Sequence, residues 1–183
     1  WGLQIGLVIA ELRERQPELR CFAEDFNPET EQVPALDAEQ LCEIYPFASK
    51  KSKEDEDFRK KAQQATFDLQ NGRKGYLALW QEILRVSIAD LKRNYNRLHV
   101  DFDLWYGESD ADRYVPRLME ILTEKGLVRE SEGALVVDIE EEGDTSPMPP
   151  VIVRKSDHSS LYATTDLATI IQRQADFAPQ QMW

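Results

Sequence analysis

The chain lacks most of the residues that build disulfide frameworks and metal sites. Among its 183 residues, the only cysteines are Cys21 and Cys42. Two cysteines are too few for a disulfide framework, and this pair has no metal-ligand spacing. The two histidines, His99 and His158, are too isolated to form a ligand pair. We therefore expect reduced thiols and no metal site.

Long apolar runs are missing as well. The longest run near the start covers residues 5–10 and contains Gly6, whereas a membrane-spanning helix needs about 20 apolar residues. No basic segment of the kind that opens a signal peptide precedes it. These absences predict a cytoplasmic protein with no membrane partner. A start at Trp1 rather than Met also indicates an internal piece of a longer chain.

Positive charge is in short supply, with 22 basic against 34 acidic side chains and a net charge of -12. This balance argues against a free-standing nucleic-acid-binding module, although it leaves room for a local basic patch in a larger RNA-binding protein. The clearest basic cluster is Lys92, Arg93 and Arg97, which we interpret as a solvated helix end rather than a nucleic-acid contact. Neither a glycine-rich phosphate loop nor a Ser/His/Asp arrangement is found in the sequence.

The start of the chain has a helical pattern. Ile5, Val8, Ile9 and Leu12 recur at helical spacing, and Pro17 closes the element. We interpret Gly2 and Gly6 as packing glycines, with close approach of a ligand as the alternative. Residues 22–36 are acidic and aperiodic, and they read as a loop or mobile linker.

Three further helices are predicted in the first half. Asp37 and Gln40 form a capping box that starts a helix through about Ala48, which Pro46 should kink or end. The charged residues 50–57 are expected on a solvated helix face. A helix ending at Gly72 and another over residues 76–98 should form an antiparallel hairpin. The expected buried face of the first is Phe58, Ala62, Ala65 and Leu69, and that of the second is Trp80, Ile83, Leu84, Ile88, Leu91 and Tyr95.

The second half mixes strands with helices. Residues 100–106 alternate between apolar and polar and predict a strand, with residues 107–109 as the turn after it. Asp112 should cap a helix over residues 113–125 that carries Val115, Leu118, Met119 and Leu122 inward and ends at Gly126. Residues 127–129 and 134–137 predict a hairpin. An acidic, proline-rich loop then covers residues 140–150.

The stretch from Val151 to Ile170 carries the candidate site. It predicts a strand over residues 151–153, a polar turn, a short strand ending at Tyr162, and a helix capped by Thr164 or Thr165. Asp166 would then lie in the first helical turn, where the helix dipole favours a carboxylate. Ligands of open α/β sheets bind where strands end and helices begin.

A fixed carboxylate beside a phenol suits a cation, and a guanidinium best, because its planar fork of donors pairs bidentately with a carboxylate. Glu108 lies at a second strand end and could complete an anionic pocket with Asp166 and Tyr162. The alternative is that Asp166 is an ordinary first-turn residue, Tyr162 an ordinary strand aromatic, and Glu108 a solvated turn residue.

Four segments, in order along nearly the whole chain, resemble arginyl-tRNA synthetase, a class I aminoacyl-tRNA synthetase. They are Trp1-Gly-Leu-Gln-Ile-Gly6, Ala48-Ser-Lys-Lys-Ser-Lys-Glu-Asp55, Tyr95-Asn-Arg-Leu-His-Val-Asp-Phe-Asp103 with Gly107-Glu108-Ser109, and Leu161-Tyr-Ala-Thr-Thr-Asp-Leu-Ala168.

The resemblance implies an α/β fold, part of a doubly wound nucleotide-binding catalytic domain with a helical insertion. Residues 1–37 would begin the catalytic segment, residues 38–98 would be the insertion, and residues 99–183 would continue the α/β segment. It also implies L-arginine, ATP and tRNA as ligands of the parent protein, with Mg²⁺ accompanying ATP. By the resemblance, Tyr162, Asp166 and Glu108 contact the arginine substrate.

The sequence departs from the family pattern in several places. The family's ATP signature would precede Trp1 and its lysine-containing mobile loop would follow Trp183, so the isolated piece should form no adenylate. Thr165 stands where many members have Arg, and Asp157-His-Ser-Ser160 replaces a glycine-containing turn. The alternatives are a non-catalytic interaction or cationic-ligand-binding domain, or, within the same enzyme class, another class I synthetase.

Overall fold

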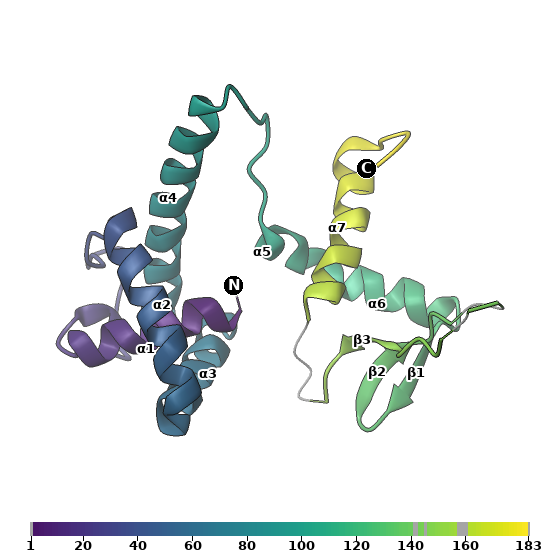
Figure 1. The fold of residues 1–183 in the computed structure, drawn as a ribbon, viewed down its shortest axis with the longest axis horizontal. Coiled ribbons are helices and arrows are strands. Elements are labelled where there is room, and N and C mark those ends of the chain that lie inside the picture. Colours follow the sequence, from purple (N-terminus) through teal and green to yellow (C-terminus); the bar gives the residue numbers. More distant parts are fainter. Residues whose placement is uncertain (1, 141–142, 145, 157–160, 183) are drawn as a thin grey trace. The chain divides into compact units, whose positions relative to one another are not determined.

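A computed structural model describes residues 2–140, 143–144, 146–156 and 161–182. The chain forms two compact units, Trp1–Asp103 and Leu104–Trp183 (Figure 1). The predicted segments 1–37 and 38–98 both fall in the first unit, and the segment 99–183 begins five residues before the second.

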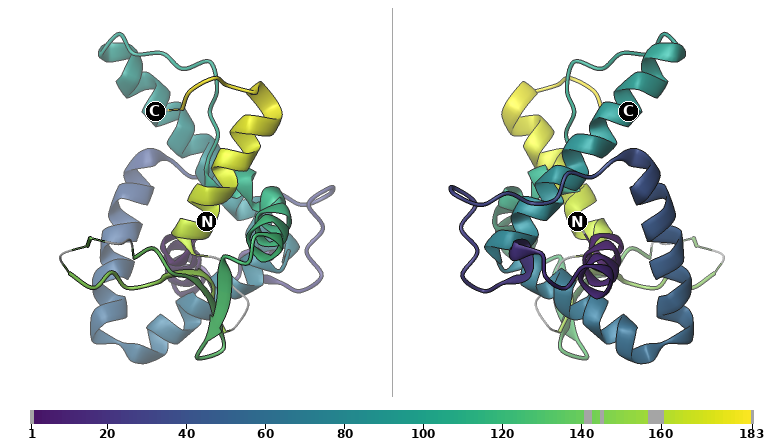
Figure 2. Two further views of the ribbon diagram at one scale, coloured as in Figure 1. Left: turned by 90° about the vertical axis from the view of Figure 1, so that its right-hand side faces the viewer. Right: turned by 90° about the vertical axis from the view of Figure 1, so that its left-hand side faces the viewer.

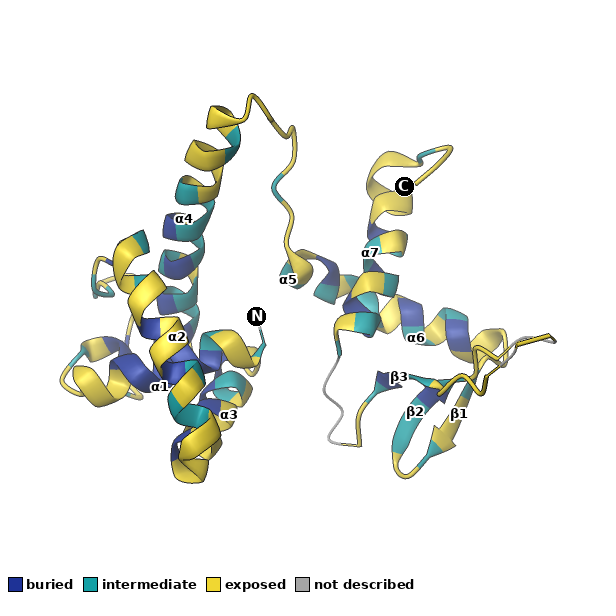
Figure 3. Ribbon diagram, in the orientation of Figure 1, coloured by how far each residue is buried: buried dark blue, intermediate teal, exposed yellow. Residues whose placement is uncertain are grey.

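The first unit is helical and is organised around its first helix. It consists of α1 (Leu3–Arg15), the short 3-10 helix η1 (Arg20–Phe22), α2 (Ala38–Glu54), α3 (Glu56–Gln70) and α4 (Lys74–Arg97). α1 packs along both α2 and α3 (Figure 2). Every residue from Gly6 to Leu12 is buried, so α1 is covered on more than one face (Figure 3).

Gly6 is where α1 and α3 come closest. A Cβ added at Gly6 would lie 2.3 Å from the Ala62 carbonyl oxygen and 2.0 Å from Thr66 Oγ1. The prediction of a packing glycine is confirmed at this position. A second such contact, which the sequence reasoning missed, lies at Gly75, whose added Cβ would fall 1.9 Å from the Cys21 carbonyl oxygen.

The start of α2 follows the prediction and its end does not. Asp37 Oδ1 accepts a hydrogen bond from the Gln40 N–H at 2.8 Å, and Gln40 Oε1 accepts one from the Asp37 N–H at 3.0 Å. The helix then passes through Pro46 and reaches Glu54. Pro46 does not end it, because packing of the buried residues Ile44 and Ala48 outweighs the lost backbone hydrogen bond.

An ion-pair network joins α1 to its neighbours and corrects the expectation of a solvated charge run at one position, Lys51. Glu11 is 3% exposed and pairs with Arg15 at 2.8 Å and Lys51 at 3.2 Å. Lys51 also pairs with Glu14, and its ammonium lies 4.4 Å from the centre of the Phe58 ring. The hydrogen bond to Glu14 raises the pKa of Lys51, so this lysine stays charged although it is half-buried.

Residues 22–36 contain no helix or strand beyond the end of η1, as expected, but they are not merely a linker. Phe22, Phe26 and Leu36 are buried in the same apolar cluster as Val8 and Leu12. The acidic composition of this loop hid its three core residues, which are too widely spaced to form a periodic pattern.

The predicted buried face of α3 is confirmed at all four positions, whereas that of α4 is confirmed in part. Ile83 is buried and Trp80 packs partly buried against the core cluster. The buried residues of α4 are Gly75, Tyr76, Leu79, Ile83 and Val86. Leu91 is 46% exposed, because the core cluster ends at Val86 and the last turns of α4 extend beyond it. α3 packs chiefly along α1 and contacts α4 much less, so the antiparallel hairpin that we expected is not the main packing of α3.

The second unit combines an antiparallel sheet with helices. Its elements are α5 (Glu108–Ala111), the 3-10 helix η2 (Asp112–Tyr114), α6 (Val115–Glu124), β1 (Val128–Ser131), β2 (Ala134–Val137), β3 (Val151–Arg154) and α7 (Tyr162–Phe177). The strands are in the order β1-β2-β3, and both pairs are antiparallel. Glu132 and Gly133 both have positive φ, as a tight hairpin turn requires, and the predicted hairpin is confirmed. Within the described ranges no strands pair in parallel.

Three predictions for residues 100–112 are wrong. Residues 100–106 form no strand, because no other described segment pairs with them. Gly107 is the N-cap of α5, and its N–H donates to Asp110 Oδ2 at 2.7 Å, so residues 107–109 start a helix. Asp112 is not the N-cap of α6, since it begins η2 and the N-cap of α6 is Tyr114.

Candidate functional site

The candidate site begins where β3 is joined to α7. Leu161 is the N-cap of α7, and Thr164 Oγ1 both accepts from the Leu161 N–H at 3.2 Å and donates to the Val153 carbonyl at 2.8 Å. Thr164 is fully buried, so this hydroxyl ties the start of the helix to the strand. The polar segment 157–160, which departs from the family pattern, lies outside the described residues.

The helix therefore begins earlier than the sequence indicated. Tyr162 is the first residue of α7 rather than the end of a strand. Thr164 and Thr165 lie inside the helix, so neither is its N-cap. Asp166 is consequently the fifth helical residue, in the second turn. The prediction that the helix dipole holds this carboxylate is wrong, because that effect is confined to the first turn.

Tyr162 and Asp166 share one face of α7. They are four residues apart, the spacing at which helical side chains are neighbours. Both are exposed, Tyr162 to 73%. The opposite side of α7 faces the core of the unit. Its buried residues are Thr164, Thr165, Ala168 and Gln172.

Glu108 is the first residue of α5 and is also exposed. α5 packs against α7, and the fully buried Ala111 belongs to the same apolar cluster as Ala168. Two tyrosines that flank α5 in the sequence, Tyr106 before it and Tyr114 after it, contact the C-terminal end of α7. The Tyr106 ring stacks on Phe177 with ring centres 6.4 Å apart, and the Tyr114 hydroxyl donates to Asp176 at 2.9 Å.

Tyr162 and Asp166 lie at the opposite end of that helix. Eleven residues separate Asp166 from Phe177, which is about 16 Å along a helix. The structure thus brings Tyr162 and Asp166 together and puts Glu108 on the adjoining helix. Since all three side chains are exposed, the described residues alone do not enclose them in a pocket.

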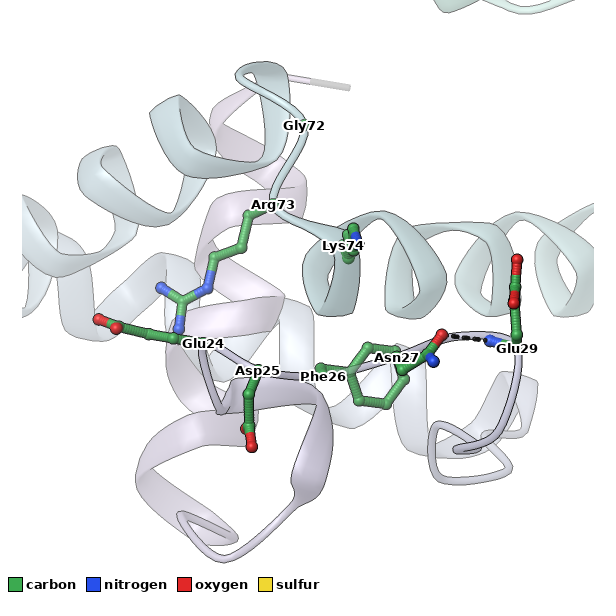
Figure 4. Close-up of a pocket in the computed structure, with 8 residues that line it drawn as sticks. All are labelled: Glu24, Asp25, Phe26, Asn27, Glu29, Gly72, Arg73 and Lys74. Atoms are coloured by element: carbon green, nitrogen blue, oxygen red, sulfur yellow. Dashed lines mark hydrogen bonds between the residues drawn. The ribbon is translucent and has the colours of Figure 1, made fainter.

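A hollow that the sequence reasoning missed lies in the first unit, between the loop after η1 and the start of α4 (Figure 4). It measures about 590 Å³ and is lined by Glu24, Asp25, Phe26, Asn27, Glu29, Gly72, Arg73 and Lys74. Arg73 has a structural role, because it donates hydrogen bonds to the Phe22 carbonyl at 2.6 Å and to Asp68 at 3.0 Å. The acidic loop was the only sequence signal for this hollow.

The described part of the chain has neither a metal-binding cluster nor a membrane-spanning helix. Among those residues, no cluster of three or more histidine, cysteine, aspartate or glutamate side chains could hold a metal ion. No helix among them has both the length and the apolar character needed to span a membrane.

Comparison with known proteins identifies the class of protein first. The family model described as "tRNA synthetases class I (R), catalytic domain" matches residues 1–182. The chain therefore belongs to the family of class I tRNA synthetase catalytic domains for arginine. The family that the four sequence segments predicted is confirmed.

The individual relatives agree with the family model. The chain is 52% identical over 182 residues to the arginine–tRNA ligase of Agathobacter rectalis and 50% identical to that of Alkaliphilus oremlandii. All of this chain is covered in both comparisons, but it spans only about 30% of the length of these relatives. The crystal structure of the arginyl-tRNA synthetase of Plasmodium falciparum matches 94% of this chain and 26% of its own, with a TM-score of 0.68 at 21% identity, a likeness of fold.

Proposed function

We propose that the full-length protein containing this chain joins L-arginine to tRNA at the expense of ATP, and that these residues supply part of its arginine pocket. The observation that carries the proposal is the match of residues 1–182 to the family, together with two arginine–tRNA ligases about half identical over the whole chain. Residues 38–98 would be a helical insertion in the catalytic domain.

In this proposal Asp166, Tyr162 and Glu108 contact the arginine side chain. The guanidinium keeps its charge at any working pH and offers five donors in a planar fork. Asp166 would accept two of these hydrogen bonds, and Glu108 would accept further ones from the same group. Tyr162 lies on the same face of α7 as Asp166, so its ring and hydroxyl can fix the direction from which the guanidinium approaches.

The exposure of these three residues bears directly on specificity. An exposed ion pair contributes about 1 kcal/mol or less, because water screens it. A site that must distinguish arginine from the neutral, nearly isosteric citrulline needs several kcal/mol, which polar groups supply only when water is excluded. We therefore propose that other parts of the full-length protein cover this face of α7 and desolvate the carboxylates.

ATP would bind mainly to residues outside this chain, and Mg²⁺ would accompany its phosphates. The described residues contain no cluster of three or more histidine, cysteine, aspartate or glutamate side chains that could hold this ion, so we assign none of them to it. The work of this piece is to position and orient the amino acid, whose carboxylate must lie close to the α-phosphate for adenylate formation. We place the protein in the cytoplasm, where tRNA is charged.

The test is arginine-dependent ATP–pyrophosphate exchange by the full-length protein with tRNA present, comparing wild type with Asp166→Asn. The substitution keeps the size of the side chain and removes its charge. We expect exchange to need arginine and to fall by at least about 100-fold, since a buried charge pair loses about 3 kcal/mol or more when one partner is neutralised. Tyr162→Phe should cost less, because it removes one hydrogen bond and keeps the ring.

The control is Asp176→Asn, at the other end of the same helix, which should leave arginine dependence unchanged. Arginine-dependent exchange that survives Asp166→Asn would keep the activity and remove Asp166 from the pocket. Exchange that depends on another amino acid would overturn the proposed substrate. The isolated 183-residue chain should give no exchange, and a measurable rate from it would contradict the view that the ATP contacts lie elsewhere.

A further inference from the structure

A second hollow in the first unit is lined by cationic and neutral side chains, although the chain as a whole is acidic. It measures about 320 Å³ and lies where the start of α1 meets α2 and α3. Its lining residues are Leu3, Gln4, Leu7, Tyr45, Ser49, Ser52, Lys53 and Arg59. Two of these are cations and none is a carboxylate, although the chain as a whole carries a net charge of -12.

One face of α2 supplies half of this lining. Tyr45, Ser49, Ser52 and Lys53 recur at helical spacing, so their side chains project from α2 in the same direction. Lys53 is exposed and forms no ion pair with another described residue. Its neighbour Lys51 differs, because it is held by Glu11 and Glu14.

Arg59, from the first turn of α3, is also available to a ligand. Its Nη1 lies 4.0 Å from the Glu56 carboxylate, and both side chains are more than half exposed. Such a pair contributes little and is broken easily in water. Lys53 and Arg59 can therefore turn their charges toward an anion in the hollow without losing a structural contact.

The remaining lining residues suit an organic group attached to that anion. Tyr45 is 40% exposed and offers a ring face, and Leu3 and Leu7 add apolar surface. An aromatic ring beside two cations is the arrangement with which proteins bind single-stranded nucleic acid, stacking a base and neutralising its phosphate. The volume is at the lower end of the range for small-ligand pockets, about 300–1,000 Å³, which fits a single nucleotide.

We propose that this hollow binds one unpaired nucleotide of tRNA, with its base against Tyr45 and its phosphate between Lys53 and Arg59. Ser49 and Gln4 would offer hydrogen-bonding groups to the sugar or the base. The Ser52 hydroxyl instead donates to the Ser49 carbonyl at 2.9 Å. The choice of tRNA as the ligand rests on the proposed function. The predicted contacts themselves would suit any single-stranded RNA.

The experiment measures binding of the cognate tRNA to the full-length protein over a range of salt concentrations. Lys53→Ala/Arg59→Ala should weaken binding and lower the slope of log affinity against log salt by about 0.7, since both cations contact the same phosphate and each neutralised phosphate of a single strand contributes about 0.7. Tyr45→Ala should weaken binding about fivefold or more, whereas Tyr45→Phe keeps the ring and should bind as wild type does.

The matched control is Lys50→Ala/Lys60→Ala, which removes the same charge from exposed positions on the same two helices outside the hollow. An equal loss of affinity in this control would overturn the proposal, because the effect would then be general electrostatics. Unchanged tRNA binding in the Lys53/Arg59 variant would overturn it as well. A raised KM for ATP with unchanged tRNA binding would assign the hollow to a free nucleotide instead.

Aminoacylation by the same proteins separates this inference from the proposed function. With arginine and ATP saturating, the Lys53/Arg59 variant should show a raised KM for tRNA and an unchanged kcat. Wild-type protein that charges no tRNA, but binds RNA through this hollow with the expected salt slope, would refute the proposed function and leave the nucleotide site standing.

Discussion

The contact between α1 and α3 at Gly6 makes the stability of the first unit sensitive to a single methyl group. In Gly6→Ala the new Cβ would lie 2.3 Å from the Ala62 carbonyl oxygen, whereas even tight Cβ contacts begin at 3.0 Å. The helices would have to separate by about 1 Å, because a backbone carbonyl cannot rotate away as a side chain can. Separation would also loosen the apolar cluster of Leu7, Ala10, Ala48, Phe58 and Ala62.

Two effects of opposite sign decide the outcome. Overpacking a core costs about 1–3 kcal/mol, and involvement of the backbone places this case at the upper end. Alanine is favoured over glycine inside a helix by about 1 kcal/mol. We expect Gly6→Ala to lower the free energy of unfolding of the first unit by about 2 kcal/mol.

The assay is hydrogen exchange of peptides from α1 and α3, measured by mass spectrometry in increasing urea. It reports the free energy of the first unit separately, which a global signal from two units would not. Gly2→Ala is the control, since its added Cβ would meet only the flexible Gln4 side chain at 3.3 Å, and it should cost less than about 1 kcal/mol.

Gly6→Ala/Thr66→Ala tests the geometry further. It removes the Thr66 hydroxyl oxygen, 2.0 Å from the new Cβ, but leaves the Ala62 carbonyl in place, so it should recover part of the loss. A Gly6→Ala protein as stable as the parent would refute the close approach of α1 and α3. Full recovery in the double variant would assign the cost to Thr66 and not to the backbone.

Two other predictions concern charge and strand pairing. Hydrogen bonds from Lys51 and Lys61 lower the pKa of Glu14 below its ordinary value of 4.5, so its contribution to stability is present above that pH and is lost as the pH falls through the folded-state pKa. Urea unfolding of Glu14→Gln should show a weaker loss of stability on acidification below about pH 4.5 than the parent shows, and identical pH profiles would contradict this assignment. Residues 100–106 alternate between polar residues and exposed apolar ones such as Val100, Phe102 and Leu104, and we expect them to pair as a strand with another segment of the full-length protein. Their amides should then exchange slowly in that protein and rapidly in the 183-residue chain, and rapid exchange in both would rule the pairing out.

Local signals predicted much of the fold correctly. The capping box at Asp37, the buried face of α3 and the hairpin at Gly133 each depend on residues within a few positions of one another, which sequence spacing reports directly. The family was also evident from four short segments. Their identities are specific enough to be recognised although they lie far apart along the chain.

The errors arose where a distant partner decides the conformation. The alternation in residues 100–106 is a strand pattern, but a strand also needs a neighbour, and none is present among the described residues. The apolar residues of α4 beyond Val86 match helical spacing, but none of them belongs to the core cluster, whose last residue in α4 is Val86. The buried Glu11 could not be distinguished from the exposed glutamates near it, because its burial follows from the positions of Lys51 and Arg15.

The same distinction between local and distant contacts applies to the candidate site. The sequence by itself determined the family, through four short segments, and with it the candidates for the arginine contacts, Glu108, Tyr162 and Asp166. Only the tertiary structure decided that Tyr162 begins a helix, that Asp166 shares its outer face, and that Glu108 lies on a separate helix packed against it. The physical reason is that the start of α7 is set by a buried hydrogen bond from Thr164 to the Val153 carbonyl eleven residues away, a contact that exists only once the strand is in place.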